Sequence, residues 1–384
     1  MAILFGTTGD GTTLPVLVDQ FGNLLAKGIP GDEGPPGPPG GAFALPPDPV
    51  DGDVLGWENG QLVWVSEPIP PVNPSIFTPV IYSGNGGTQS ITGVGFSPDL
   101  VWIKDRTSSS VHYLTDTVRG ATKYLDSAST NEERIDNQSL ISFDSDGFTL
   151  GSTGGINGTG YDYVAWCWEA GDTTETNPDG TIESQVRSNG NFSVVKYTGN
   201  QDPSDSFGHG LSDVPSFVLI KRLNDTFSWR VYHKSLPTHG FLVLNENTGV
   251  DVNSNNFPSA PTDTVIYVGV GTGVNTNADD YIAYCWAETP GESSFSEYTG
   301  NGSTTGPVID CGFEPSFVMI KSTSNGDWYV MDAARGANKI LYPNLSNAES
   351  TESNIEFTDI GFNIITSAAN LNSSSQNYIY AAFR

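Results

Sequence analysis

The sequence is short of basic residues and of cysteine, and both shortages exclude classes of protein. Sixteen Lys and Arg stand against 44 Asp and Glu, which gives a formal net charge of −28. A chain this acidic is repelled by nucleic acid unless it carries a local basic cluster, and the sequence shows none. Three cysteines in 384 residues are too few for a disulfide framework. We therefore expect no nucleic-acid partner and no disulfide scaffold.

Long apolar runs and long helix-forming stretches are missing as well. No run of 18 apolar residues occurs, so we expect no membrane insertion. The start of the chain lacks the basic region of a signal peptide, which favours a cytosolic protein or a component of an assembled particle. The chain has 44 Gly, 25 Pro and 42 aromatic residues (8 Trp, 15 Tyr and 19 Phe). This composition excludes an acidic disordered chain and predicts an all-β protein rich in turns.

Residues 28–40 read GIPGDEGPPGPPG, the pattern of a collagen triple helix. Strict Gly-X-Y spacing suits three polyproline-II chains, because only glycine fits at their common axis. The alternative is a flexible Pro/Gly linker, which has no reason to keep this period. We therefore predict a homotrimer with a collagen-like neck at 28–41. Glycine occupies every third position, at Gly28, Gly31, Gly34, Gly37 and Gly40.

The segments beside this neck contain short β-prone runs. Residues 1–27 cannot bury their own apolar side chains, so we interpret them as an attachment segment that docks on a larger partner or on its own copies. In 42–75, Asn59-Gly60 between two apolar runs predicts a β-hairpin, followed by a Pro-rich linker. A lone hairpin is marginally stable in water, so Trp57 and Trp64 are predicted to pack in the trimer.

From residue 76 the chain repeats itself three times. We divide it into a first repeat (76–171), a second repeat (172–290, with a leading linker) and a third repeat (291–384). The landmarks that recur in each repeat are Tyr82-Ser-Gly-Asn85, Tyr197-Thr-Gly-Asn200 and Tyr298-Thr-Gly-Asn301; the apolar runs that end in Ile-Lys at Lys104, Lys221 and Lys321; and the final strands from Tyr163 to Trp168, Tyr281 to Trp286 and Tyr378 to Phe383.

These landmarks predict the packing of each repeat. The Ile-Lys runs are continuously apolar, as in a central strand covered on both faces. The final strands pair a small residue with a large one, Ala165 with Trp166, and the third repeat reverses the order with Tyr380 and Ala381. This exchange conserves volume, which is typical of a core. The expected fold is all-β: an attachment segment, a triple-helical neck and three tandem β-sandwich modules.

The residues that carry chemistry elsewhere form no recognisable catalytic pattern. Cys167, Cys285 and Cys311 each align with an apolar residue of a sister repeat, which indicates buried thiols. Asp144-Ser-Asp-Gly147 resembles the start of a calcium loop but lacks its distal ligands, and a β-turn is the preferred interpretation. No enzymatic activity, metal or cofactor is expected. The four histidines, which match no metal-binding or catalytic motif, are His112, His209, His233 and His239.

One cationic element occurs twice, Asp116-Thr-Val-Arg-Gly-Ala-Thr-Lys123 and Asp332-Ala-Ala-Arg-Gly-Ala-Asn-Lys339. The structural interpretation is an Asp–Arg pair that braces a turn. The functional interpretation is a polar tip whose cations contact an acidic sugar or phosphate of a cell envelope. The candidate receptor contacts are Arg119, Lys123, Arg335 and Lys339.

The landmarks together resemble a repeated β-domain of tail-fibre and other appendage proteins of marine bacteriophages, notably those of cyanobacteria. The resemblance extends to Trp229-Arg-Val-Tyr-His233, Leu341-Tyr-Pro-Asn-Leu-Ser-Asn347 and Asn177-Pro-Asp-Gly-Thr-Ile-Glu-Ser184, and covers 76–384. The Leu-Val-Asp-Gln-Phe-Gly-Asn stretch before the Gly triplets likewise resembles the proximal end of such fibres.

The resemblance implies a trimeric virion component whose task is recognition of the host surface. We expect a tail fibre or appendage that adsorbs to a bacterial envelope glycan and is held by other tail or neck proteins through residues 1–27. The alternatives are a head- or neck-decorating fibre with a structural role only, and a tail spike that degrades polysaccharide. A cell-surface adhesin fits less well, because the sequence shows no export signal.

Overall fold

The computed structural model describes residues 2–7, 13–18, 53–58, 61–66 and 76–384, and before residue 76 it describes the strands alone. The chain divides into two compact units, Met1–Asn73 and Pro74–Arg384. The regular structure is nearly all β, which confirms the predicted class; the two helices described, α1 (Gly154–Asn157) and α2 (Ala369–Asn372), are single turns. No helix among the described residues has the length and apolarity needed to cross a membrane.

Two antiparallel pairs make up the described part of Met1–Asn73. Strand β1 (Ala2–Thr7) pairs with β2 (Thr13–Val18), and β3 (Asp53–Glu58) pairs with β4 (Gln61–Ser66). Glu58 lies opposite Gln61, so two residues connect β3 and β4, as predicted for this hairpin. The register sets Trp57 opposite Leu62 and Trp64 opposite Leu55. The Gly28–Gly40 run lies outside the described residues, so the neck and the trimer stay predictions.

In Pro74–Arg384 the landmark strands form the middle of three antiparallel sheets. Four strands follow the same order in all three sheets. The second sheet has two further strands at one edge of this set, and the third sheet has two further strands at the opposite edge. The first sheet is β5 (Phe77–Ser83), β13 (Asp162–Trp168), β7 (Leu100–Asp105) and β8 (Tyr113–Asp116). The second is β14 (Thr174–Asn177), β15 (Ser184–Ser188), β16 (Phe192–Thr198), β23 (Asp280–Ala287), β18 (Pro215–Arg222) and β19 (Arg230–His233). The third is β24 (Ser293–Thr299), β32 (Asn377–Phe383), β26 (Phe317–Ser322), β27 (Trp328–Asp332), β28 (Gly336–Leu341) and β29 (Ser350–Thr351).

Shorter strands cover the outer face of each large sheet and close its edges. In the first repeat they are β6 (Gln89–Thr92), β9 (Lys123–Tyr124), β10 (Arg134–Ile135), β11 (Leu140–Asp144) and β12 (Gly147–Leu150). In the second they are β17 (Ser206–Gly208), β20 (Gly240–Phe241), β21 (Asp251–Val252) and β22 (Val265–Tyr267). In the third they are β25 (Val308–Asp310), β30 (Ile355–Thr358) and β31 (Gly361–Ile364).

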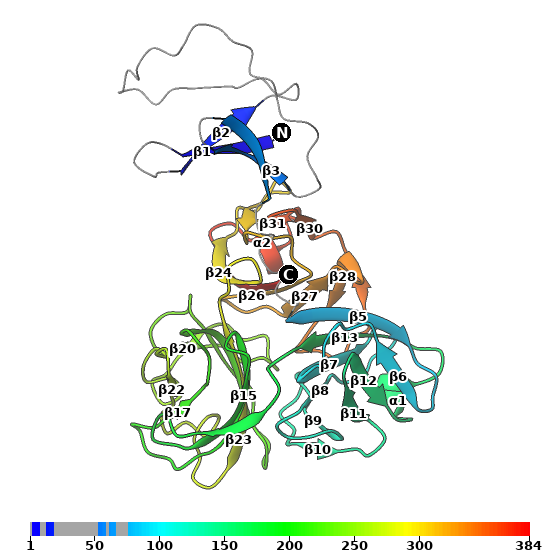
Figure 1. The fold of residues 1–384 in the computed structure, drawn as a ribbon. Coiled ribbons are helices and arrows are strands. Elements are labelled where there is room, and N and C mark those ends of the chain that lie inside the picture. The colour runs from blue at the N-terminus through cyan, green and yellow to red at the C-terminus, as the bar shows by residue number, and fades with distance from the viewer. Residues whose placement is uncertain (1, 8–12, 19–52, 59–60, 67–75) are drawn as a thin grey trace, which may run out of the picture. The chain divides into compact units, whose positions relative to one another are not determined.

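Each large sheet is buried on both faces, but by different partners. Along β13, Ala165 and Cys167 belong to a cluster confined to the first repeat, while Val164 and Trp166 belong to a cluster shared by all three repeats. The second and third repeats divide their strands in the same way. Pro74–Arg384 is therefore one compact unit in which three lobes meet, running from cyan through green to red in Figure 1.

Aromatic residues at or next to the ends of the three middle strands meet in the shared core. The rings of Trp168, Trp286 and Phe383 form a triangle with centroid distances of 5.8, 5.6 and 6.1 Å. The reversed pair of the third repeat follows from the same geometry, because Ala381 faces this core and Tyr380 faces the local one. The prediction that these strands are core is confirmed, since they are buried almost throughout.

The Tyr-x-Gly-Asn landmark holds the start of each repeat to the turn before its middle strand. In the first repeat the Tyr82 hydroxyl donates to the carbonyl of Ile156, and the Asn85 amide donates to Asn157 Oδ1. A Cβ on Gly84 would lie 2.2 Å from the carbonyl oxygen of Gly158, so only glycine fits there. The second and third repeats make the same bonds, from Tyr197, Asn200, Tyr298 and Asn301.

Gly84→Ala should therefore destabilise the fold, because the methyl group has to displace backbone rather than a flexible side chain. We expect a loss of about 1–3 kcal/mol in the free energy of unfolding, measured by urea denaturation. Gly154→Ala is the matched control, because no heavy atom lies within 4 Å of its Cβ position. Equal unfolding midpoints for the two variants would contradict this account of the landmark.

Candidate functional site

The three repeats pack in a ring around the shared core, and equivalent contacts recur at each of the three junctions between them. Trp229, Trp328 and His112 hold the same register position, and each sends a ring N–H to a backbone carbonyl of a neighbouring repeat. The bonds are Trp229 Nε1 to Asp126 O at 3.0 Å, Trp328 Nε1 to Val243 O at 3.1 Å, and His112 Nε2 to Tyr342 O at 3.0 Å. A second set joins backbone amides to carbonyls, Glu133 to Leu223, Val250 to Thr323 and Glu349 to Arg106.

A third contact at each junction explains the duplicated cationic element. Asp116, His233 and Asp332 hold one register position, opposite Leu100, Phe217 and Phe317. Asp116 accepts a hydrogen bond from the Tyr284 hydroxyl at 2.8 Å, and Asp332 accepts one from Trp166 Nε1 at 2.8 Å. At the junction that lacks the element, His233 Nε2 bonds the carbonyl of Tyr380 at 3.0 Å.

The two arginines proposed as receptor contacts are interior residues. The Arg119 side chain is 1% exposed and that of Arg335 is 0% exposed. Each guanidinium binds the aspartate three residues earlier, a strand carbonyl and a glutamate; Arg335 Nε lies 2.6 Å from Asp332 Oδ2. Neither group is available to a receptor, which corrects the functional interpretation of these two residues and supports the structural one.

The two lysines of the element lie nearer the surface. The Lys123 side chain is 39% exposed and that of Lys339 is 32% exposed. Lys123 pairs with Glu133 at 3.4 Å, and Lys339 Nζ donates to the Thr351 hydroxyl at 2.8 Å. Lys123 also lines a cavity of 190 Å³ between the first and second repeats. These two residues remain predicted receptor contacts.

Two of the buried histidines are held in the neutral form at the junctions. His112 Nδ1 accepts the Trp102 indole N–H, and His233 Nδ1 accepts the Ser235 amide. Each Nε2 therefore carries the single proton and donates to a carbonyl. Burial lowers the pKa of His112 to about 3 and that of His233 to about 4. His233 and His239 do not meet; His239 bonds the carbonyl of Phe257.

The Ile-Lys landmark places three buried lysine side chains on the inner faces of the sheets. Lys104 and Lys321 each donate to the carbonyl of the following residue, and so does Lys221. Burial lowers their pKa values to about 8 for Lys104 and Lys321 and about 7 for Lys221. An amine in this range can act as a base or nucleophile, but these lie inside the protein and satisfy backbone carbonyls.

The remaining sequence candidates also have structural partners. Cys167 and Cys285 are buried as predicted, while Cys311 is half-buried, and burial raises the pKa of its thiol to about 11. Asp144 and Gly147 face each other at the end of the β11–β12 hairpin, which confirms the β-turn interpretation. The described residues contain no group of three His, Cys, Asp or Glu that could hold a metal ion.

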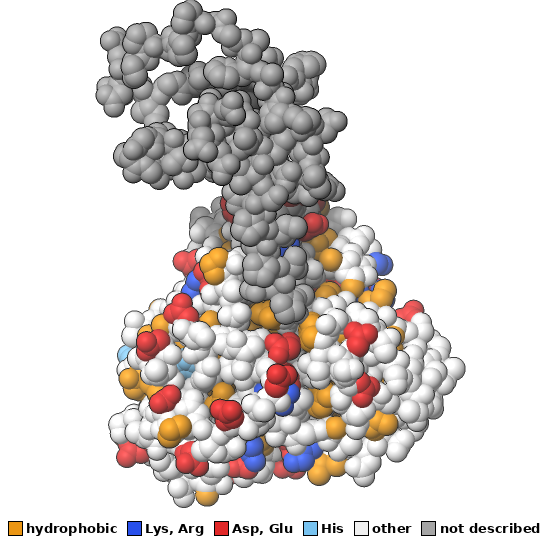
Figure 2. Space-filling view, in the orientation of Figure 1, with side chains coloured by type: hydrophobic (Ala, Val, Ile, Leu, Met, Phe, Trp, Pro, Cys, Tyr) orange, Lys and Arg blue, Asp and Glu red, His pale blue; other side chains and the backbone are white. Residues whose placement is uncertain are grey.

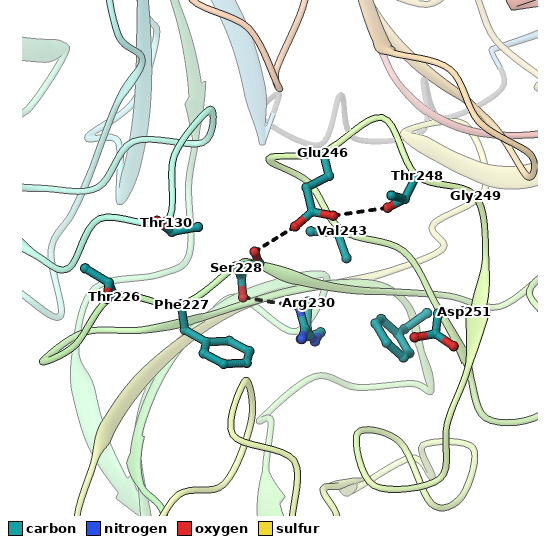
Figure 3. A pocket seen from close by; sticks show the side chains of 11 residues that line it. Thr130, Thr226, Phe227, Ser228, Arg230, Val243, Glu246, Thr248, Gly249 and Asp251 are labelled. Atoms are coloured by element: carbon teal, nitrogen blue, oxygen red, sulfur yellow. Dashed lines mark hydrogen bonds between the residues drawn. The ribbon is translucent and has the colours of Figure 1, made fainter.

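A large hollow lies at the edge of the second sheet. Figure 2 shows acidic side chains scattered over the visible face of Pro74–Arg384, with fewer lysines and arginines between them. The hollow measures 580 Å³, and its lining includes one cation, Arg230, and two carboxylates, Glu246 and Asp251 (Figure 3). No motif in the sequence marked Arg230 as a candidate site residue. The signal that could have found it is an arginine where both sister repeats have tyrosine.

Arg335→Met should destabilise the protein strongly, because it leaves the buried carboxylate of Asp332 without its cation. We expect a loss of about 3–5 kcal/mol in the free energy of unfolding. Lys339→Met, which removes a partly exposed cation of the same element, should cost about 0–1 kcal/mol. Chemical denaturation of both variants distinguishes the two. An Arg335→Met protein as stable as the wild type would show that this ion pair does not brace the junction.

Stability should fall on mild acidification. The unfolded chain protonates His112 and His233 below about pH 6.5, but the folded protein does so only near pH 3–4. The free energy of unfolding therefore decreases as pH falls from about 6.5 to about 4, by up to about 1.4 kcal/mol per pH unit for each histidine. Urea denaturation at a series of pH values measures this slope, and His233→Gln should reduce it without abolishing it, because burial lowers the pKa values of His112 and His209 as well. A flat profile above pH 5 would contradict the neutral assignment.

Comparison with known proteins gives one match. The model of a family described as a domain of unknown function, DUF7483, matches residues 73–384, while no curated protein and no solved structure matches the chain. The matched range coincides with the compact unit Pro74–Arg384 and spans all three repeats. The family model therefore describes the three repeats together and not a single repeat. Because the match covers more than half of the chain, the protein belongs to the DUF7483 family.

Proposed function

We propose that the protein is a structural virion component, a homotrimeric tail fibre or appendage that adsorbs to a glycan of a bacterial envelope. Residues 1–27 attach it to other tail or neck proteins. The neck at 28–41 joins three chains, and Pro74–Arg384 is the displayed head. In this view each head is built of three β-sandwich modules that close around one core. The protein acts by binding and carries out no reaction.

The observation that carries this proposal is a Gly-X-Y run that precedes, along the chain, a hairpin and a large β unit. Three polyproline-II strands need glycine at every third position, and an ordinary linker does not. Three heads on one neck present identical surfaces together, so contacts that are weak singly add up to firm attachment. The hollow lined by Arg230, Glu246 and Asp251 offers each head a polar surface for such a contact. The resemblance to phage appendage proteins supports the same assignment.

A second candidate is a fibre with a structural role on the particle only. The specific observation in its favour is the use of the duplicated cationic element inside the protein. Arg119 donates to the Tyr284 hydroxyl of the second repeat and Arg335 lies over the Trp166 ring of the first, so the recurring cations serve the fold. This candidate keeps the virion location and the trimer but requires no binding to cells.

Two measurements on the intact chain test the proposal. Native mass spectrometry should give a mass of three 40.9 kDa chains. Fluorescently labelled protein should bind cells from a panel of marine cyanobacteria, and periodate oxidation of the cell-surface glycans should abolish that binding. A monomeric mass rejects the trimeric fibre. A trimer that binds no cells favours the structural role, and binding that survives periodate rejects a glycan as the receptor.

A further inference from the structure

The second repeat differs from its sister repeats at one register position. Tyr113, Arg230 and Tyr329 each pair with the isoleucine that precedes the landmark lysine of their own sheet. In the first repeat Tyr113 stacks on Tyr124 at 4.2 Å, and in the third Tyr329 packs against Tyr342 at 5.1 Å. These rings pack at the register position that Arg230 holds in the second repeat. In the second repeat, the edge instead carries an arginine and the 580 Å³ hollow.

Arg230 is held in place without an ion pair. Its guanidinium lies 4.9 Å from the ring centre of Phe227 and 5.0 Å from that of Phe241, and Nε donates to Asn256 Oδ1 at 3.2 Å. Among the described residues it pairs with no carboxylate, and its Nη2 donates to no group. The other arginines that are not fully exposed all pair with a carboxylate, namely Arg106, Arg119, Arg187, Arg222 and Arg335.

The rest of the hollow supplies groups that complement hydroxyls. The Asp251 carboxylate is exposed and accepts no hydrogen bond from a described side chain, so it remains an acceptor in the same hollow as the free donors of Arg230. Glu246 accepts from the Ser228 and Thr248 hydroxyls, at 2.9 and 3.4 Å (Figure 3). A sugar hydroxyl both donates and accepts, so it can use an arginine and a carboxylate together. The volume is within the roughly 300–1,000 Å³ range of small-ligand sites.

We propose that this hollow binds an uncharged hexose residue of a glycan, with hydroxyls between Arg230 and Asp251 and the apolar face of the sugar against Phe227. This inference rests on the proposed function and adds the binding site and the ligand class. The lining carries one cation and two carboxylates, in a chain of net charge −28. An anionic sugar therefore meets repulsion, and an uncharged one does not.

The test uses the intact protein and four oligosaccharide probes: maltotriose, mannotriose and lactose as uncharged sugars, and trigalacturonate as an acidic one. Saturation-transfer NMR detects binding, and titration gives the dissociation constants. We expect at least one uncharged probe to bind, with the same affinity at low and high salt. Arg230→Tyr, which restores the residue of the sister repeats, should weaken that binding roughly tenfold or more.

Arg134→Gln is the matched control, because Arg134 is an exposed arginine outside the hollow. It should leave the dissociation constant within a factor of about two. Circular dichroism confirms that both variants fold. The proposal is overturned if no uncharged probe binds, if trigalacturonate binds more tightly in a salt-dependent manner, or if Arg230→Tyr binds like the wild type.

Binding to whole cells separates this inference from the proposed function. If Arg230→Tyr still binds cyanobacterial cells like the wild type and periodate still abolishes the binding, the hollow is rejected while glycan adsorption stands. If the wild type shows no periodate-sensitive binding to any cells, the proposed function fails. The oligosaccharide titrations then decide on the hollow alone.

Discussion

The shared apolar core is the constraint on which the rest of Pro74–Arg384 depends. A sheet that buries only its outer face against its own short strands would expose Trp102, Trp166 and Trp168 to water in the first repeat alone. Burying large aromatic side chains stabilises a protein by about 1.5–3 kcal/mol each, so an isolated repeat loses much of its stabilisation. Closing three such sheets around one centre removes all the inner faces from water at once. It also explains why one family model spans the three repeats together.

Directional contacts set the angle at which the sheets meet in this core. Indole or imidazole N–H groups reach across every junction to the carbonyl at the same position of the neighbouring repeat. The repeats share these contacts but differ in a second contact at each junction. Two junctions use a buried Asp–Arg pair, and the third uses neutral His233 against the backbone beside Ala381. A buried charge needs a partner, so the aspartate and the arginine are kept together at two junctions and both are absent from the third.

Because the core and the junctions fix the buried residues, recognition can differ between repeats at the residues nearer the surface. The middle strands carry almost no exposed side chains. The buried lysines of the neighbouring strands and the histidines at the junctions bond backbone carbonyls. At one register position the repeats carry different residues, tyrosine in the first and third and arginine in the second. Arg230 occupies this position, held between two rings but with donors to spare. A scaffold repeated three times can thus carry a binding site in one repeat while the others maintain the fold.

The sequence alone determined the all-β class, the β3–β4 hairpin, the three repeats and the double burial of their central strands. Local patterns encode these features, since turn residues and runs of apolar side chains report burial directly. Only the tertiary structure decided what buries the inner faces, and that partner is another repeat of the same chain rather than a separate molecule. It also decided that Arg119 and Arg335 point inward and that Arg230 borders a hollow. Contacts such as that of Trp166 with Asp332 join residues far apart in the chain. A run of apolar residues indicates that a strand is buried, but it does not indicate which residues bury it.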